Sequence, residues 1–307
     1  MKSITESNIE TYAIEQLQSL GWQYVHGLSI APGAAQAERE SFEQIVLTER
    51  LRKAAAVLNP HIPTDVREQA VQKVMRIYSP DLLHNNETLH QYLVEKVKIP
   101  YNQDGYERSH EVALFDFDNW LNNEFLASNQ YIITENNNKK IPDILLFVNG
   151  IPVVIIELKN AADENATLRK AYEQIQTYKA TIPSLFTYNA VCVISDGHEC
   201  KAGSVSAGFS RYMTWKTADG IKDASRFKPQ LEVLVSGMLN PATLLDLVRN
   251  FIVFEKTISA KPSSLSFGEG RGEVTQIVTE KKLAAYHQYY AVNKAVESTI
   301  KASGQGG

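Results

Sequence analysis

The clearest pattern of apolar and polar positions in the chain is a pair of apolar runs separated by Asn-Gly at 149–150. The first run covers 144–148, the second covers 151–156, and polar or charged residues flank the pair. Asn-Gly between apolar runs predicts a two-stranded hairpin, because both residues tolerate a positive φ. Such a hairpin brings Asp143, which precedes the first run, back beside Glu157 at the end of the second run.

The register of this hairpin decides which residue faces Asp143. An ideal two-residue turn pairs Asp143 with Ile156, whereas a bulge or a connection longer by one residue pairs it with Glu157. Pro152 lacks a backbone N–H and lies just past the turn, so an irregular register can arise there. Side chains alternate along a strand, which puts Glu157 and Lys159 on one face. In the shifted register, Asp143 joins them on that face.

Two carboxylates and a lysine on adjacent strands can hold a magnesium ion, a water and a phosphate together. Asp143 and Glu157 would bind Mg²⁺, which prefers oxygen ligands, and the backbone carbonyl of Leu158 could add another ligand. Lys159 would orient the attacking water or neutralise charge that develops on the phosphate. This pattern favours a metal-dependent phosphodiesterase that acts on DNA. The alternative is that Glu157 and Lys159 simply pair at the end of a strand.

Apolar positions three and four residues apart predict helices along most of the remaining chain. The predicted helices cover 7–20, 39–58, 64–78, 89–97, 165–182, 241–254 and 280–302. A continuous apolar run at 190–195 predicts a buried strand, parallel to the strand of Glu157 because a strand–helix unit precedes it. The runs at 211–217 and 231–239 are strand-like or mixed. The prediction is therefore an α/β fold, with a mixed central sheet flanked by helices and a helical insertion at about 39–98.

Two of these helices carry candidate functional residues beside the hairpin. Gln174 and Tyr178 are four residues apart and share a helix face that borders the apolar stripe. They could position the catalytic lysine or the DNA backbone, or they could be an ordinary helix former and a core aromatic residue. In the helix at 7–20, Ser7 and Glu10 have the spacing of a capping box.

Composition narrows the classes of protein that fit. Cys192 and Cys200 are the only cysteines, too few for a disulfide framework or a metal–thiolate set, and the seven histidines lack zinc-ligand spacing. The N-terminus has no apolar signal region and no run reaches transmembrane length, so we expect a cytoplasmic protein without a membrane partner. The formal charge of −4 does not indicate nucleic-acid binding, yet lysines and arginines crowd the proposed site at 139–179.

The motif Pro142-Asp143 … Glu157-Leu158-Lys159 resembles the signature of PD-(D/E)xK nucleases. Gln174 and Tyr178 add the Q-x-x-x-Y pattern of one branch, which includes the nuclease region of the restriction (R) subunit of type I restriction–modification enzymes. The stretches 115–125, 195–203 and 281–296 also resemble that subunit. The resemblance implies a restriction-endonuclease-like fold, and it suggests that an acidic residue on the first helix, here Glu10, helps to bind the metal.

The resemblance also implies an organisation and a set of partners. Residues 1–256 would form the endonuclease domain, 257–279 a linker, and 280–307 the opening helix of an ATP-dependent translocase that is cut short. Gln288 would contact adenine in the full-length protein, or it would lie on a plain amphipathic surface helix. The partners would be double-stranded DNA and the methylase and specificity subunits. The alternatives are a docking module that holds DNA without cutting it, and a stand-alone repair nuclease of the same fold.

Overall fold

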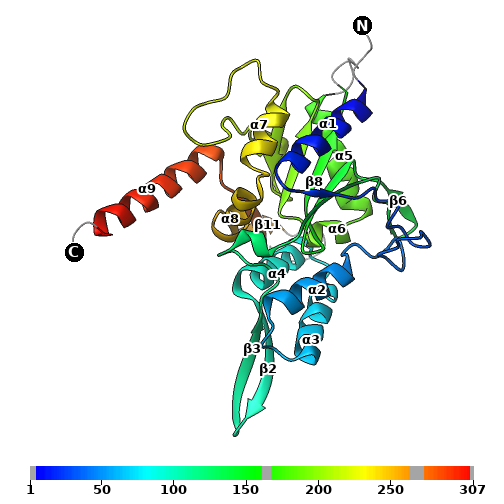
Figure 1. Ribbon diagram of the computed structural model, residues 1–307, viewed down its shortest axis with the longest axis vertical. Helices are drawn as coiled ribbons and strands as arrows, with labels where there is room; N and C mark the ends of the chain where they lie inside the picture. Colours follow the sequence, from blue (N-terminus) through cyan, green and yellow to red (C-terminus); the bar gives the residue numbers. More distant parts are fainter. Residues whose placement is uncertain (1–4, 161–166, 263–272, 305–307) are drawn as a thin grey trace.

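The fold was analysed in a computed structural model, which describes residues 5–160, 167–262 and 273–304. Its centre is a mixed six-stranded sheet with helices on its flanks (Figure 1). β1 runs parallel to β4, β8 runs parallel to β9, and the remaining neighbours are antiparallel. In spatial order the strands are β1 (Gln23–Tyr24), β4 (Phe125–Asn129), β7 (Ile144–Val148), β8 (Ile151–Leu158), β9 (Val191–Ser195) and β10 (Cys200–Gly203). The predicted fold class is confirmed.

The hairpin of β7 and β8 has the irregular register that Pro152 made possible. Asn149 and Gly150 both have positive φ, at 50° and 82°, as a tight two-residue turn requires. Phe147 pairs with Pro152 near the turn, but the register shifts by one residue farther on, so that Ile144 pairs with Ile156. Asp143 therefore lies opposite Glu157 and not opposite Ile156.

Helices pack on the sheet around its inner strands β8 and β9. α1 (Glu6–Ser19) contacts β8 and packs against α7 (Gln230–Gly237), while α5 (Leu168–Thr181) packs against β8 and β9. α5 stops before Pro183, and the short α6 (Ser184–Thr187) follows. Every residue of β7, β8 and β9 is buried, which explains why these strands read as continuous apolar runs.

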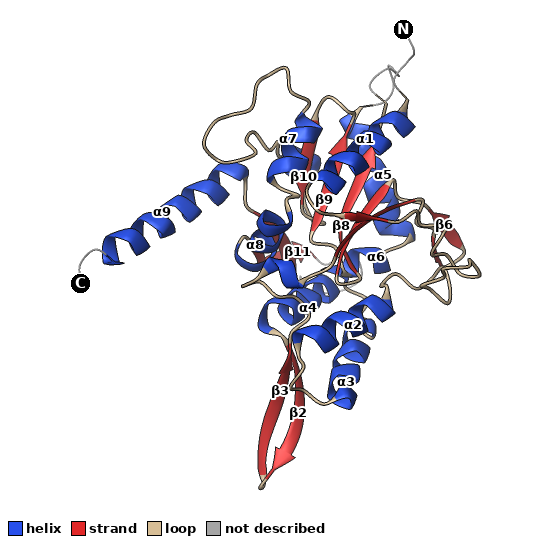
Figure 2. Cartoon of the chain, viewed as in Figure 1, coloured by secondary structure: helices blue, strands red, loops and turns tan. Residues whose placement is uncertain are grey.

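The insertion between β1 and β4 contains three helices and a long hairpin (Figure 2). The helix predicted at 39–58 begins only at Thr48, and the third helix starts earlier than predicted and ends at Glu95, before Lys96 with its positive φ. The hairpin of β2 and β3 was not predicted. The elements are α2 (Thr48–Leu58), α3 (Thr64–Met75), α4 (Leu82–Glu95), β2 (Val97–Gln103) and β3 (Tyr106–Val112), and the small β5 (Ile133–Glu135) and β6 (Asn138–Lys140) pair separately.

The C-terminal part differs from the prediction in two places. The run at 231–239, which we described as strand-like or mixed, contains the helix α7, and α8 (Pro241–Asn250) is shorter than predicted because the chain turns into a strand at Ile252. The described parts of the expected linker are paired strands, β11 (Ile252–Pro262) and β12 (Glu273–Leu283), followed by α9 (Tyr286–Gly304). The Gly-rich stretch at 263–272 lies outside the described residues.

Lys281 fastens β12 to the body of the protein. Its side chain is 3% exposed, and its Nζ donates hydrogen bonds to Asn86 Oδ1 at 2.8 Å and to the carbonyl of Asn189 at 2.7 Å. The hydroxyl of Ser204 donates to the carbonyl of Lys281 at 2.5 Å. The base of the β11–β12 hairpin is thus held against the rest of the fold and is not a free connection.

No single helix among the described residues combines the length and the apolar composition needed to cross a membrane. Helices α7 and α8 meet these criteria only as a pair, across a bend of 71°.

Candidate active site at the end of β8

The open end of the β7–β8 hairpin brings the three predicted residues into contact. The backbone N–H of Leu158 donates to Asp143 Oδ2 at 2.6 Å, and Lys159 Nζ donates to Glu157 Oε1 at 2.7 Å. Lys159 Nζ also donates to the carbonyl of Leu158 at 2.8 Å, while its own backbone N–H donates to Ser195 of β9 at 2.8 Å. The strand alternation and the bulge together place both carboxylates and the ammonium at one point.

Burial makes this cluster electrostatically unusual. Burial, followed by the charge of Glu157, raises the pKa of Asp143 to about 8. Burial also raises the pKa of Glu157, although the ammonium of Lys159 opposes this shift. For Lys159, burial lowers the pKa, but the neighbouring carboxylates, Glu157 foremost, outweigh it and the net shift is upward. Two carboxylates held this close in a dry site favour an additional positive charge between them.

One oxygen in the cluster accepts no hydrogen bond from the described residues. Glu157 is 2% exposed, and this oxygen, Oε2, is buried, whereas its Oε1 accepts from Lys159. The hydroxyl of Tyr178 is close enough to lower the pKa of the Glu157 carboxyl. A buried carboxylate oxygen left in this way is costly, and a cation is the group that would satisfy it. Within 5–160, 167–262 and 273–304, no three His, Cys, Asp or Glu side chains are grouped as a complete set of metal ligands. The residues present fit an ion that uses two carboxylates and a backbone carbonyl.

The first helix supplies a different contact from the one predicted. Glu10 accepts a hydrogen bond from the side chain of Asn129, whereas Glu6, one turn earlier, lies 3.7 Å from the ammonium of Lys159. The predicted capping box of Ser7 and Glu10 is wrong, because Thr5 and Asn8 cap α1 instead. Sequence reasoning missed Glu6, although its spacing of four residues from Glu10 puts both on one face of α1.

Tyr178 and Gln174 lie behind the carboxylates on α5. The hydroxyl of Tyr178 donates to the carbonyl of Ile141 at 3.3 Å, and burial and the nearby Glu157 raise the pKa of Tyr178. Gln174 contacts the same hydroxyl and lowers that pKa. Tyr178 is 4% exposed. It is therefore a core residue that also borders the site, and its role in positioning stays a prediction.

Gln288 lies apart from this cluster. It is exposed on the first turn of α9, and its side-chain oxygen accepts from the backbone N–H of Ala285 at 2.9 Å. This contact caps the start of the helix. An adenine contact by Gln288 stays a prediction.

Comparisons with known proteins agree with the geometry. The sequence model of the family described as the N terminus of the type I restriction enzyme R protein matches residues 3–211. The chain is 38% identical to the HindI endonuclease subunit of a type I restriction enzyme from Haemophilus influenzae, over 99% of the chain and 28% of that protein. It is 29% identical to the putative MjaIXP endonuclease subunit of Methanocaldococcus jannaschii, over 95% of the chain and 27% of that protein.

The chain thus spans less than a third of the length of these two relatives, and the match covers both strands of the hairpin and the helix behind it. With the site geometry and the family model in agreement, the chain belongs to the family of type I restriction enzyme R protein N termini.

Proposed function

We propose that this chain is the magnesium-dependent nuclease region of a type I restriction endonuclease subunit and that it hydrolyses phosphodiester bonds in double-stranded DNA. The observation that carries the proposal is that the half-buried Asp143 and the buried Glu157 lie beside Lys159, while Glu157 Oε2 accepts no hydrogen bond from the described residues. A solely structural ion pair would not leave a buried carboxylate oxygen unsatisfied.

Asp143, Glu157 and the carbonyl of Leu158 would hold the ion. Magnesium suits such a site because it takes one or two carboxylates and completes its shell with waters and substrate phosphate. When bound, it would polarise the phosphate and lower the pKa of a coordinated water. Lys159 donates to two of the proposed ligand oxygens, on Glu157 and Leu158. Its positive charge therefore already lies beside the proposed position of the ion and the phosphate. Its ammonium would serve the attacking water or the phosphate.

The remaining neighbours would position these groups. Tyr178 and Gln174 would keep the Glu157 carboxylate in place, and Glu6, beside Lys159, would orient the ammonium from α1. Glu10 acts through Asn129, which lies at the end of β4 and pairs with Ile144 next to Asp143. We therefore rank Glu6 above Glu10 as the contribution of the first helix.

The family relationship extends the proposal to the complete enzyme. There the chain would cut DNA in the cytoplasm as part of a complex with methylase and specificity subunits, and ATP would drive translocation by a motor that follows α9. Cleavage without these partners would instead indicate a stand-alone repair nuclease.

The test uses the complete enzyme with plasmid DNA, magnesium and ATP. Asp143→Ala, Glu157→Ala and Lys159→Ala should each lower the cleavage rate by roughly 100-fold or more while ATP hydrolysis continues. Glu173→Gln is the matched control, since Glu173 is an exposed acidic residue on α5 whose ion-pair partner within the described part of the chain is Arg169. Cleavage at the wild-type rate by the Asp143 variant would refute the nuclease assignment.

A second measurement tests the metal in the chain itself. Calorimetry with Mn²⁺ should detect weak binding to the wild type and none to Glu157→Ala, because substrate phosphate normally supplies part of the shell. Equal binding by both proteins would place the ion elsewhere.

A further inference from the structure

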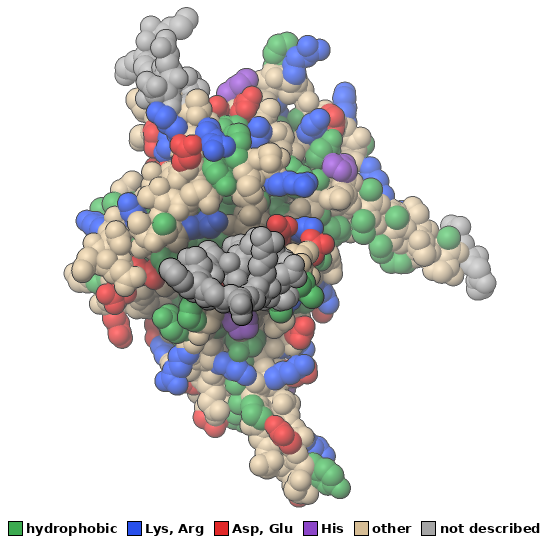
Figure 3. Space-filling model, turned by 180° about the vertical axis from the view of Figure 1, so that it is seen from behind, with side chains coloured by type: hydrophobic (Ala, Val, Ile, Leu, Met, Phe, Trp, Pro, Cys, Tyr) green, Lys and Arg blue, Asp and Glu red, His purple; other side chains and the backbone are tan. Residues whose placement is uncertain are grey.

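The hairpin of β2 and β3 projects from the insertion as a two-stranded arm. Figures 1 and 3 show it clear of the body from opposite sides, at the far end of the molecule from the start of α1. Its base is anchored by Val97, Ile99 and Val112, which are buried, whereas nearly every residue beyond them is exposed or half-buried. A two-stranded ribbon contributes little stability by itself. An arm of this length is therefore better explained by binding to another molecule than by the stability of the fold.

The two faces of this arm differ in charge. Strand alternation and the pairing of Tyr101 with Arg108 and of Gln103 with Tyr106 define one face. This face, which we call the basic–aromatic face, consists of Tyr101, Gln103, Tyr106, Arg108 and His110. It contains no carboxylate, and the rings of Tyr101 and His110 stack with centroids 4.3 Å apart. The opposite face carries both glutamates of β3, Glu107 and Glu111, together with Lys98.

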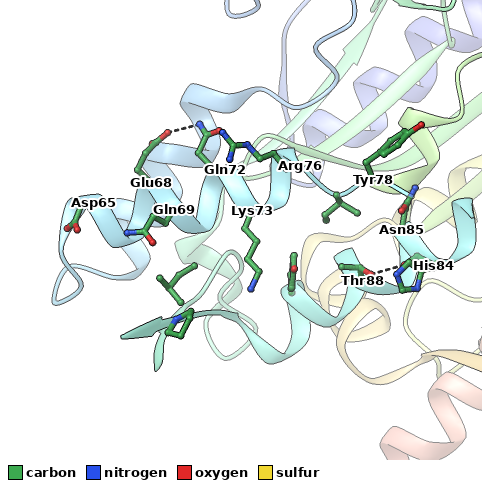
Figure 4. Close-up of a pocket in the computed structure, with 14 residues that line it drawn as sticks. Asp65, Glu68, Gln69, Gln72, Lys73, Arg76, Tyr78, His84, Asn85 and Thr88 are labelled. Carbon is green, nitrogen blue, oxygen red and sulfur yellow. Dashed lines mark hydrogen bonds between the residues drawn. The ribbon is translucent and has the colours of Figure 1, made fainter. Parts of the chain in front are cut away.

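A groove between α3, α4 and β2 lies at the base of the arm. The groove has a volume of about 820 Å³, and Ile99 and Pro100 of β2 are among the residues that line it. Lys73 reaches from α3 into this space (Figure 4), where its ammonium lies 5.5 Å from the ring of Tyr92 and donates to the carbonyl of Lys98 at 3.1 Å. The groove therefore adjoins the base of the arm, next to the basic–aromatic face.

The rim of the groove adds further polar groups. Arg76 and Tyr78 at the end of α3 and His84 on α4 are exposed, and Tyr78 is 88% exposed. The acidic residue closest to them along α3, Glu68, is paired with Arg52 at 2.8 Å, and hydrogen bonding to Arg52 lowers its pKa to about 2. Its charge is thereby compensated within the protein, whereas Asp65, which also lines the groove, is exposed. Lys73 and Arg76 supply the positive charge of the lining.

We propose that the basic–aromatic face and the groove bind the backbone of duplex DNA, at a distance from the cleavage site. A two-stranded β-ribbon has the width to enter the major groove, which is about 12 Å wide. Arginine, lysine, tyrosine and glutamine are the side chains that contact phosphates and sugars. The proposal rests on the proposed function in one respect, namely that DNA is the substrate.

The composition of the arm favours DNA over a protein partner. Pro100 removes a backbone donor from β2, as is typical of exposed strands that are protected against the addition of another strand. Beyond the buried anchors, the basic–aromatic face has no aliphatic side chain that a protein interface could bury. Its positive charge comes from Arg108, and the acidic residue nearest to this face, Asp104, lies in the turn at the tip. A cation among aromatic and amide side chains suits a polyanion, in spite of the net charge of −4 on the chain.

The test measures binding of the complete 307-residue chain to a labelled duplex in EDTA, so that cleavage cannot contribute. Arg108→Glu should weaken binding about tenfold and lower the slope of log K against log salt by about one to two, since one phosphate contact is lost and a repulsive charge is added. Lys98→Glu is the matched control, because it makes the same change of charge on the opposite face. It should leave both quantities near the wild-type values. Tyr106→Ala, at the tip, should also weaken binding.

Two results would overturn the proposal. Equal losses in Arg108→Glu and Lys98→Glu would show a general charge effect, and unchanged DNA binding with impaired assembly with methylase and specificity subunits would make the arm a protein interface. Failure of the proposed function is recognised separately, because Glu157→Ala tests cleavage and leaves the arm intact. If Arg108→Glu binds DNA normally while cleavage still depends on Glu157, DNA binding by the arm is refuted and the proposed function is not.

Discussion

Two lysines, the half-buried Lys159 and the buried Lys281, have opposite electrostatic surroundings. Lys159 at the end of β8 donates to Glu157 and lies near Asp143 and Glu6, and although burial lowers its pKa, the carboxylates raise it overall. Lys281 on β12 is more deeply buried, and its hydrogen-bond partners among the described residues are neutral: the side chain of Asn86 and the carbonyl of Asn189. Burial lowers its pKa to about 7.

The difference shows how charge separates a reactive site from a structural one. Lys159 stays protonated because carboxylates surround it, and these carboxylates are themselves destabilised by burial. Such mutual dependence is typical of functional sites, where charges are kept in place at a cost in stability. Lys281 instead gives up its proton easily, since hydrogen bonds to neutral oxygens do not compensate for the loss of water. It holds β12 in place and needs no charge to do so.

The largest expected effect separates the two lysines by function. Lys159→Met should lower DNA cleavage by the complete enzyme by roughly 100-fold or more, because the charge beside Glu157 is lost. Lys281→Met should leave the cleavage rate within a few-fold of the wild type, measured with magnesium and ATP in excess. Equal losses in the two variants would mean that the anchoring of β12 matters to catalysis as much as the ammonium of Lys159.

The second largest effect should be the pH dependence of stability, which distinguishes Lys281 from Lys159. The pKa of Lys281 is about 7 in the folded protein and near the ordinary lysine value of about 10.4 when unfolded. Unfolding between these values takes up a proton, so raising the pH stabilises the folded state. The melting temperature of Lys281→Met should be closest to that of the wild type near pH 7 and fall behind as the pH rises toward 10. If the melting temperatures of the two proteins differ by the same amount at every pH from 7 to 10, Lys281 remains charged in the folded state.

A third prediction concerns the stability cost of the carboxylates around Lys159. The pKa of Asp143 is raised to about 8, so the folded state loses stability as the pH rises from the unfolded value near 4 through 8. Asp143→Asn removes this loss. Its melting temperature in EDTA should exceed that of the wild type at pH 8, and the gain should vanish near pH 4. A gain that persists at pH 4 would have a cause other than ionisation.

Much of the candidate site could be predicted because its determinants are local. Asn149-Gly150 selects the turn, and Pro152 follows it where the register shifts, so that Asp143 reaches Glu157. The parallel placement of β9 follows from the helix that precedes it. The bounds of α5 follow from its apolar spacing and from Pro183.

The rest depended on contacts between distant segments. β4 pairs on both sides within the sheet, yet its five residues are too short to stand out from the polar sequence around them. The burial of Lys281 arises from α4 and from the segment before β9, which the alternating polar pattern of β12 does not reveal. Likewise, Glu6 and Glu10 are equivalent by spacing, and only the packing of α1 determines which of them meets Lys159.

The smallest expected effect tests whether Tyr178 belongs to the reactive side of the comparison or to the structural side. Its ring is buried, and its hydroxyl lies between Ile141 and the Glu157 carboxylate. Tyr178→Phe keeps the ring and removes only the hydroxyl. The free energy of unfolding should therefore fall by about 1 kcal/mol or less, the value of one hydrogen bond. Cleavage should nevertheless fall several-fold, because Glu157 would lose a group that holds its carboxylate. Tyr178→Ala should lower both stability and cleavage, since it also empties the core. If Tyr178→Phe cleaves DNA at the wild-type rate while Tyr178→Ala is defective only in proportion to its lower stability, the hydroxyl has no part in positioning Glu157, and Tyr178 acts as a core residue alone.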